Sequence, residues 1–260
     1  MTKKQSKTIL ELKSASLDIP LFHNTNRTLK SSFINSLTGG KFKKIKNITY
    51  INALNNLNIK FLEGERVGLI GHNGAGKTTF LRLISGIYSL SKGTIKRRSK
   101  IYPMIHKSLL TSEELSGIKA MKAHYLLINQ NLKGFENFCK NVVNFSGLGE
   151  YIYLPLKTYS QGMLSRLQFA ILTGCSHECL ALDEGFATGD IDFQKKAYSR
   201  LTDFISNSGT LFLASHSNEL LLRFCKRGLV FEKGTIAFDG PIEKALNFYE
   251  EKIWWKTKEK

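Results

Sequence analysis

A glycine-rich stretch in the first third of the chain has the residue types that bind phosphate. From Gly71 to Thr78 it follows the pattern Gly-x-x-x-x-Gly-Lys-Thr. Glycines allow a tight turn whose backbone N–H groups point at phosphate oxygens, and a helix N-terminus behind the loop adds partial positive charge. In this pattern Lys77 reaches the β- and γ-phosphates and the Thr78 hydroxyl binds Mg²⁺. The sequence therefore predicts a nucleoside-triphosphate loop made of Gly71, His72, Asn73, Gly74, Ala75, Gly76, Lys77, Thr78 and Thr79.

Two adjacent carboxylates supply the acidic groups that such a loop needs. Asp183 and Glu184 directly follow the apolar run 179–182. By themselves they would be interpreted as an ordinary solvated turn. Beside a phosphate loop, Asp183 is expected to hold Mg²⁺, and Glu184 to polarise the attacking water as general base.

Two more segments have polar residues where a ligand could be met. Ser160 precedes a helical pattern, so it is predicted to cap that helix, with Gly162 in the first turn of an anion-binding helix start. His216 follows the apolar run 211–214. A histidine at the carboxyl end of a strand faces the ligand crevice of an α/β sheet.

The surrounding pattern indicates the elements that must position these groups. Residues 66–70 are typical of a short buried strand, and the apolar residues from Phe80 to Ile87 have helical spacing. Short apolar runs at 180–182 and 211–214 resemble buried parallel strands. Alternation of such strands with helices predicts an α/β fold with a largely parallel sheet. The remaining predictions are strands over 8–22 and 50–62, a loop with one short helix over 23–48, mostly helix over 105–172, and a hairpin over 229–238.

Composition limits the classes further. The chain has 260 residues, and its 42% hydrophobic content excludes a wholly disordered protein. No apolar run approaches the roughly 18 residues of a membrane-spanning helix, and no apolar run follows the basic N-terminus, so we expect a cytoplasmic protein. The four cysteines lack disulfide or zinc spacing and are expected to be small buried residues.

The charge of the chain is unevenly distributed. The net charge is +17, and the first 100 residues contain nineteen Lys/Arg against four Asp/Glu. The other 160 residues contain nineteen against seventeen. Such asymmetry suits nucleic acid, phosphate ligands or an anionic membrane surface, and composition alone does not choose among them.

Taken in order, these motifs resemble the ATP-binding subunit of ABC transporters from about Ile9 to Tyr249. The resemblance implies a P-loop NTPase, with a RecA-like core, an antiparallel β-subdomain and a helical subdomain. It implies one ATP-binding domain over 1–260, with the core at about 1–100 and 174–260, the helical subdomain at about 101–173 and a basic insertion at about 23–48.

The resemblance also implies roles and partners. Two copies would pack head to tail, so that Ser160, Gln161 and Gly162 touch the ATP held by the partner copy. His216 would contact the γ-phosphate, and the loop containing Gly189 and Asp190 would cross the dimer. The implied cofactors are ATP and Mg²⁺, with Thr78 and Asp183 as metal ligands. The implied catalytic residues are Lys77, Glu184 and His216.

Departures from the usual motifs narrow the family. The signature is Tyr-Ser-Gln-Gly-Met at 159–163, where Leu-Ser-Gly-Gly-Gln is usual, and 166–170 reads Arg-Leu-Gln-Phe-Ala. Both are similar to the polysaccharide-exporter branch, which handles O-antigen, capsule and teichoic-acid chains. That branch implies a separate membrane permease, a lipid-linked polysaccharide as cargo and a peripheral place on the cytoplasmic face of the bacterial inner membrane.

The alternative functions are an ABC ATPase for a lipid or drug exporter, or a non-transport ABC ATPase acting on nucleic acid. A single phosphate loop and the absence of heptads disfavour the last, so no nucleic-acid partner is expected.

Some positions stay open at the level of sequence. Tyr50 and Phe22 are both candidates for stacking on adenine, and both could equally be core aromatics. His106 is a candidate for the position where a glutamine is usual. The basic segment 23–48 is either a solvated loop or a surface for anionic lipid and the carrier diphosphate. Trp254 and Trp255 could stack on sugar, although packing is the more ordinary role.

Overall fold

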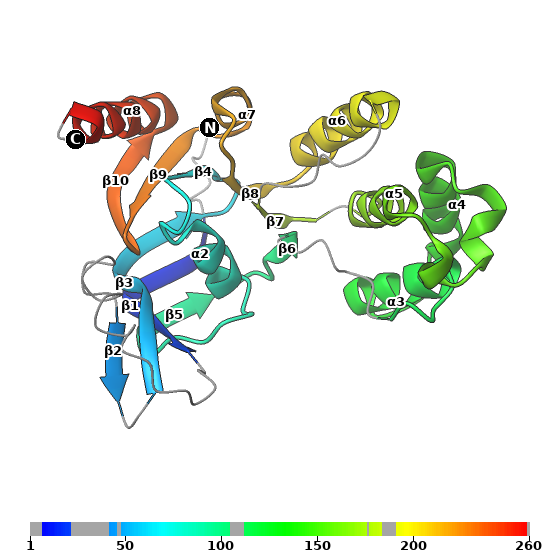
Figure 1. The fold of residues 1–260 in the computed structure, drawn as a ribbon, viewed down its shortest axis with the longest axis horizontal. Helices are drawn as coiled ribbons and strands as arrows, with labels where there is room; N and C mark the ends of the chain where they lie inside the picture. The colour runs from blue at the N-terminus through cyan, green and yellow to red at the C-terminus, as the bar shows by residue number, and fades with distance from the viewer. Residues whose placement is uncertain are drawn as a thin grey trace. The chain divides into compact units, whose positions relative to one another are not determined.

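The computed structural model describes residues 7–21, 42–45, 48–104, 112–175, 177–183 and 191–258. They form two compact units (Figure 1). The first contains the described residues within 1–103, 179–183 and 209–260, and the second those within 104–178 and 184–208.

The first unit is built on two sheets. The strands, in chain order, are β1 (Thr8–Leu21), β2 (Phe42–Ile45), β3 (Ile48–Leu62), β4 (Arg66–Ile70), β5 (Lys92–Arg97), β6 (Tyr102–Met104), β7 (Cys179–Asp183), β8 (Thr210–Ala214), β9 (Arg227–Glu232) and β10 (Thr235–Pro241). One sheet has six strands in the order β10-β9-β4-β8-β7-β6, and the other has four in the order β2-β3-β1-β5.

The six-stranded sheet has the parallel centre that the sequence predicts. Strand β4 pairs in parallel with β8 on one side and with β9 on the other, and β8 pairs in parallel with β7. Because β4, β7 and β8 run in the same direction, their carboxyl ends lie at one edge of the sheet. The predicted hairpin is confirmed, since β9 and β10 pair antiparallel.

The four-stranded sheet corrects one prediction. Within the segment 23–48, which the sequence suggested to be a loop with one short helix, Phe42–Ile45 forms strand β2 and pairs antiparallel with β3. Strand β1 lies between β3 and β5, antiparallel to both. A strand can form here because neighbouring β3 supplies backbone hydrogen-bond partners. The basic side chains of the segment, which have no clear alternating pattern, give no sign of this pairing. The remainder of 23–48 lies outside the described residues apart from Ile48, which begins β3.

Aromatic packing fixes the helix behind the phosphate loop. Helix α2 (Lys77–Ile84) buries Phe80, whose ring centroid lies 6.1 Å from that of Phe61 and 5.2 Å from that of Phe231. Phe61 meets Phe212 edge to face at 4.9 Å. All four rings are almost fully buried, so β3, β8 and β9 together hold the first turn of α2 in place.

The second unit is helical, as predicted for 105–172. Its elements are α3 (Gly117–Asn129), α4 (Phe135–Ser146), η1 (Gly149–Tyr153), η2 (Leu156–Thr158), α5 (Gln161–Leu172) and α6 (Ile191–Ser206). Phe193 and Ala197 of α6 belong to its hydrophobic core. Helix α6 therefore groups with the helical unit, although its residues lie within 174–260, a range expected to belong to the core.

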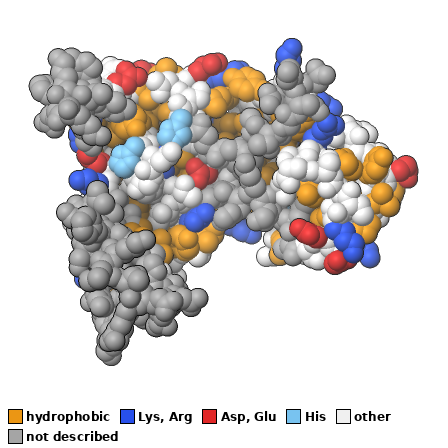
Figure 2. All heavy atoms as spheres, in the orientation of Figure 1, with side chains coloured by type: hydrophobic (Ala, Val, Ile, Leu, Met, Phe, Trp, Pro, Cys, Tyr) orange, Lys and Arg blue, Asp and Glu red, His pale blue; other side chains and the backbone are white. Residues whose placement is uncertain are grey.

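Two helices complete the first unit: α7 (Asn218–Phe224) and α8 (Ile242–Lys258), the latter packing against β9 and β10. Within the part of the chain that the structure describes, no helix is both long and apolar enough to cross a membrane. Figure 2 shows the described basic side chains scattered over the visible face, with acidic side chains among them. The excess positive charge therefore forms no continuous basic patch among the described residues of that face.

Candidate functional site

The glycine-rich loop connects central strand β4 to helix α2. Gly71 has a φ of 149°, and a Cβ added there would lie 2.6 Å from the carbonyl oxygen of Phe231. Any side chain at this position would push the loop away from β9. Glycine is therefore required both by backbone conformation and by close approach.

The ammonium group of Lys77 lies inside the loop. The residue is only 8% exposed, and its Nζ donates to the carbonyl oxygens of Gly71 and, at 3.3 Å, of His72. A buried ammonium that lines the loop is well suited to an anionic ligand, because burial strengthens electrostatic attraction.

Strand β7 brings a carboxylate to the first turn of α2. The Thr78 hydroxyl donates to Oδ2 of Asp183 at 2.6 Å. A hydroxyl and a carboxylate side by side are the hard oxygen ligands that Mg²⁺ prefers. These residues therefore fit the metal that the family resemblance implies, although no cluster of three or more metal-ligating side chains occurs among the described residues. A nucleotide-bound magnesium needs only one or two protein ligands, since phosphates and waters supply the others.

Strand β8 brings His216 to the same edge. The His216 Nε2 lies 3.2 Å from Oδ1 of Asn73, a residue of the loop. The next residue, Ser217, caps α7 by accepting from the Leu220 N–H at 3.3 Å, which fixes the turn that presents the imidazole. The predicted loop, carboxylate and histidine thus lie in one site, as expected for residues that follow the carboxyl ends of the parallel strands β4, β7 and β8.

The structure adds Gly234, which the sequence analysis assigned only to a hairpin turn. Its N–H donates to the Ala75 carbonyl at 2.9 Å, and its own carbonyl accepts from the Asn55 N–H at 2.8 Å. The β9–β10 turn therefore links the phosphate loop to β3. The local sequence carried no signal for this link, because it joins residues distant in the chain.

The signature segment lies in the helical unit. The predicted cap is confirmed, since α5 begins at Gln161 and the Ser160 hydroxyl accepts from the Met163 N–H at 3.2 Å. Ser160, Gln161 and Gly162 are all exposed. Burial raises the pKa of Tyr159, whose hydroxyl donates to the Tyr151 carbonyl at 2.5 Å. The tyrosine thus anchors the segment, while the next three residues remain accessible to another molecule.

Tyr50 is the described candidate for stacking on adenine. It is half-buried on β3, four residues before Leu54, whose side chain lies 3.2 Å from where a Gly76 Cβ would stand. Because four strand residues span about 13 Å, Tyr50 lies about that far along β3 from the residue that approaches the phosphate loop. Four residues with predicted roles lie outside the described residues, so these roles stay predictions: Phe22, His106, Glu184 and Asp190.

The prediction of buried cysteines is confirmed for two of the four, since Cys139 and Cys175 are only half-buried. All four cysteines are free, and Cys179 and Cys225 are buried. Burial raises the pKa of each of these two thiols to about 12, which makes them unreactive.

A phosphate loop between a central parallel strand and a helix, with a carboxylate at a nearby strand end, defines a P-loop nucleoside triphosphatase. The family model for "ABC transporter" matches residues 54–187. The chain belongs to the ATP-binding ABC transporter family, whose members are ATPases.

Relatives confirm the predicted branch. The chain is 34% identical over 230 residues to the O-antigen export system ATP-binding protein RfbE of Yersinia enterocolitica, covering 88% of this chain and 96% of the relative. It is 32% identical to the teichoic acids export ATP-binding protein TagH of Bacillus anthracis, over 81% of this chain and 38% of that longer protein. A solved ATP-binding subunit of an ABC transporter shares the fold, with a TM-score of 0.64, 18% identity and 91% of each chain covered.

Proposed function

We propose that this chain is the ATP-hydrolysing subunit of an exporter of lipid-linked polysaccharide, such as O-antigen, capsule or teichoic acid. The observation that carries the proposal is the match along 96% of an O-antigen export protein. The Tyr-Ser-Gln-Gly-Met signature supports it. Conversion of ATP binding into transport requires a separate permease.

Each site residue has a role in this proposal. Lys77 and the loop N–H groups bind the β- and γ-phosphates, and Tyr50 stacks on adenine. Thr78 and Asp183 would hold Mg²⁺, which when bound neutralises charge on the phosphates. Glu184 accepts the proton of the attacking water, and His216 donates a hydrogen bond to the γ-phosphate.

The proposal includes a second copy of the chain. Exposed Ser160, Gln161 and Gly162 form a helix start with free access from solvent, which suits contact with the γ-phosphate of ATP bound to the partner copy. Asp190 contributes to the same interface. The dimer lies peripherally at the cytoplasmic face of the bacterial inner membrane, bound to its permease.

Glu184→Gln tests the reaction and the cargo together. Loss of the general base should lower the rate of ATP hydrolysis at least about 100-fold while ATP binding persists. Cells carrying this variant should lose surface polysaccharide and accumulate its lipid-linked form inside. Asn207→Ala, at an exposed asparagine outside the proposed site residues, is the control. Normal surface polysaccharide with hydrolysis abolished would refute the cargo, and normal hydrolysis would refute the base.

A further inference from the structure

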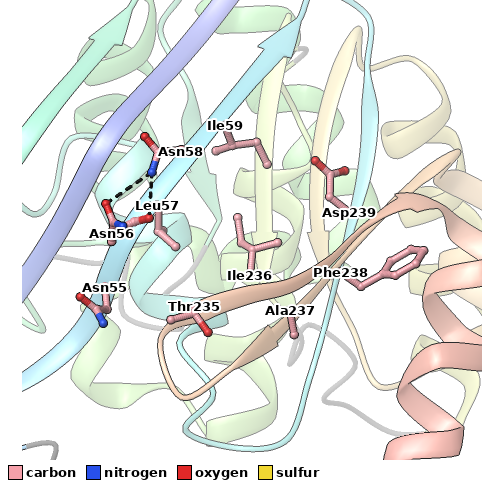
Figure 3. A pocket seen from close by; sticks show the side chains of 10 residues that line it. All are labelled: Asn55, Asn56, Leu57, Asn58, Ile59, Thr235, Ile236, Ala237, Phe238 and Asp239. Carbon is pink, nitrogen blue, oxygen red and sulfur yellow. Dashed lines mark hydrogen bonds between the residues drawn. The ribbon is translucent and has the colours of Figure 1, made fainter.

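A polar hollow of about 490 Å³ lies between β3 and β10, outside the proposed nucleotide site. Residues 55–59 of β3 form one wall and residues 235–239 of β10 form the other (Figure 3). Its volume falls within the range of about 300–1,000 Å³ that is usual for small-molecule sites.

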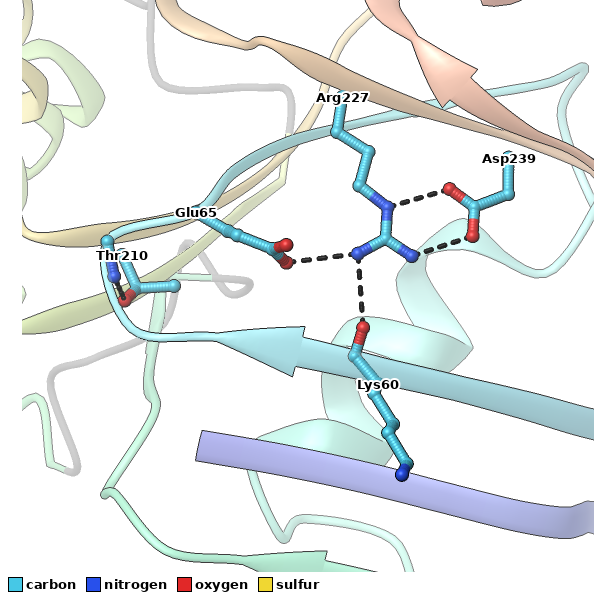
Figure 4. A network of polar contacts seen from close by, with 6 residues as sticks. Lys60, Glu65, Thr210, Arg227 and Asp239 are labelled. Atoms are coloured by element: carbon cyan, nitrogen blue, oxygen red, sulfur yellow. Dashed lines mark hydrogen bonds and ion pairs between the residues drawn. The ribbon is translucent and has the colours of Figure 1, made fainter. Parts of the chain in front are cut away.

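At each end of the hollow, hydrogen bonds join the two walls. At one end the Asn55 N–H donates to the Gly234 carbonyl at 2.8 Å. At the other end Arg227 donates from Nη1 to the Lys60 carbonyl at 3.0 Å, and from Nε and Nη2 to Asp239 at 2.7 and 2.6 Å (Figure 4). Along β3 the two sets of hydrogen bonds lie at Asn55 and Lys60, five residue steps or about 17 Å apart. The hollow therefore suits a compact ligand better than an extended peptide strand, which would have to run out through both ends.

The polar groups of the hollow are mostly neutral. Three exposed asparagines contribute amides. The Asn58 amide donates to the carbonyl oxygen and Oδ1 of Asn56 at 3.1 and 3.4 Å, whereas within the described part of the chain the Asn55 amide makes no hydrogen bond with protein. An amide both donates and accepts, as a sugar hydroxyl does. Asp239 and Glu65 both bind Arg227, whose pKa is raised chiefly by its hydrogen bonds to Asp239. The Asp239 charge is thereby compensated, so the hollow has no strong preference for a cation or an anion.

Apolar side chains complete the lining. Half-buried Ile236 lines the β10 wall, and buried Leu57 and Ile59 line the β3 wall, whereas the ring of Phe238 stacks on Phe248 with centroids 5.2 Å apart. Neutral amides beside aliphatic surface match a ring that has hydroxyl or acetamido groups at its edge and C–H groups on its face.

We propose that this hollow binds a neutral sugar unit, and that the phosphate loop senses its occupancy through Gly234. The choice of a sugar rests on the proposed function, because it makes the cargo itself the ligand. The path is short: Asn55, which lines the hollow, bonds Gly234, and Gly234 bonds Ala75 of the loop. A ligand that shifts the β10 wall therefore moves a direct neighbour of the phosphate loop.

Saturation-transfer NMR on the full chain tests binding, with N-acetylglucosamine, galactose and rhamnose as separate probes. At least one probe should receive saturation from the wild-type protein. Asn55→Ala removes the free amide and should weaken binding about fivefold. Ala237→Tyr places a ring in the hollow at an exposed position and should abolish binding. Asn207→Ala, another exposed asparagine, is the matched control and should bind normally. Thermal unfolding of each variant checks that it is folded.

The outcomes separate this proposal from the proposed function. The sugar site is overturned if no probe receives saturation, or if a probe receives equal saturation from the wild type and from Ala237→Tyr. Either result would stand even if the same wild-type sample hydrolyses ATP. The bound sugar should change the KM for ATP of the wild type at least twofold and leave that of Ala237→Tyr unaltered by sugar. An unchanged wild-type KM overturns the sensing step.

Discussion

At the scale of single residues, Gly234 is held in a conformation and a space that only glycine tolerates. Its φ is 81°, and an added Cβ would lie 2.6 Å from the Ala53 carbonyl oxygen. Gly64 has nearly the same φ, 79°, but an added Cβ there would meet nothing within 4 Å. The chain thus contains a matched pair that separates backbone strain from contact with the phosphate loop.

Alanine at these two positions should give different kinetics. Both substitutions should destabilise the protein by about 1–2 kcal/mol through left-handed backbone strain. Gly234→Ala must also move the turn away from Ala53, which shifts its partner Ala75 in the loop and should lower kcat/KM for ATP about 10- to 100-fold. Urea unfolding and steady-state ATPase assays measure the two effects. Equal kcat/KM in the two variants would show that Gly234 does not position the loop.

These residues show which contacts a sequence reveals. The proximity of Thr78 to Asp183, and of Asn73 to His216, was predictable because each motif directly follows a buried parallel strand. The contact between Gly234 and Ala75 was not, because it depends on how two turns meet after both sheets have formed. No local pattern encodes that contact.

At the scale of elements, helix α3 carries a buried titratable group. His124 is 4% exposed, and burial lowers its pKa to about 4. In the unfolded chain the imidazole titrates near 6.5. Between these values the unfolded chain binds the proton and the folded protein does not, so stability falls as the pH falls from about 6.5 towards 4.

His124→Phe should reduce this acid sensitivity. Phenylalanine keeps an aromatic ring of similar size and removes the titration. Between pH 7.5 and pH 5, the wild type should lose about 2 kcal/mol more unfolding free energy than the variant. Urea denaturation at the two pH values measures the difference. The same loss in both proteins would exclude His124 as the cause.

Elements were predictable where burial gave them a clear apolar pattern. Strands β4, β7 and β8 are short runs of buried apolar residues, and all were expected. Strand β5 was not, because five of its six residues are exposed and three are basic. It forms because its backbone pairs with β1, so the neighbouring strand determines it more than its own side chains do.

At the scale of the whole molecule, the proposed head-to-tail dimer makes each ATP site depend on two chains. One copy contributes Lys77 and the other contributes Gly162. Gly162→Asp is a suitable disruption, because an added Cβ meets only the Ser160 hydroxyl oxygen at 3.9 Å, and acidic residues stabilise a first helical turn. The new carboxylate should leave the fold intact and repel the phosphates of the partner copy's ATP.

Mixing two inactive variants should therefore restore activity. Lys77→Ala and Gly162→Asp homodimers each have two defective sites, but their heterodimer has one site with an intact Lys77 and an intact Gly162. If subunits exchange randomly, half of the dimers are mixed, and hydrolysis should recover to about a quarter of the wild-type rate. The double variant mixed with either single variant should stay inactive, since every site then lacks one partner. Differently tagged chains verify that subunits exchange. If the mixture of single variants then shows no activity, head-to-tail assembly is contradicted. Head-to-tail assembly predicts activity because the two residues of one site come from different copies.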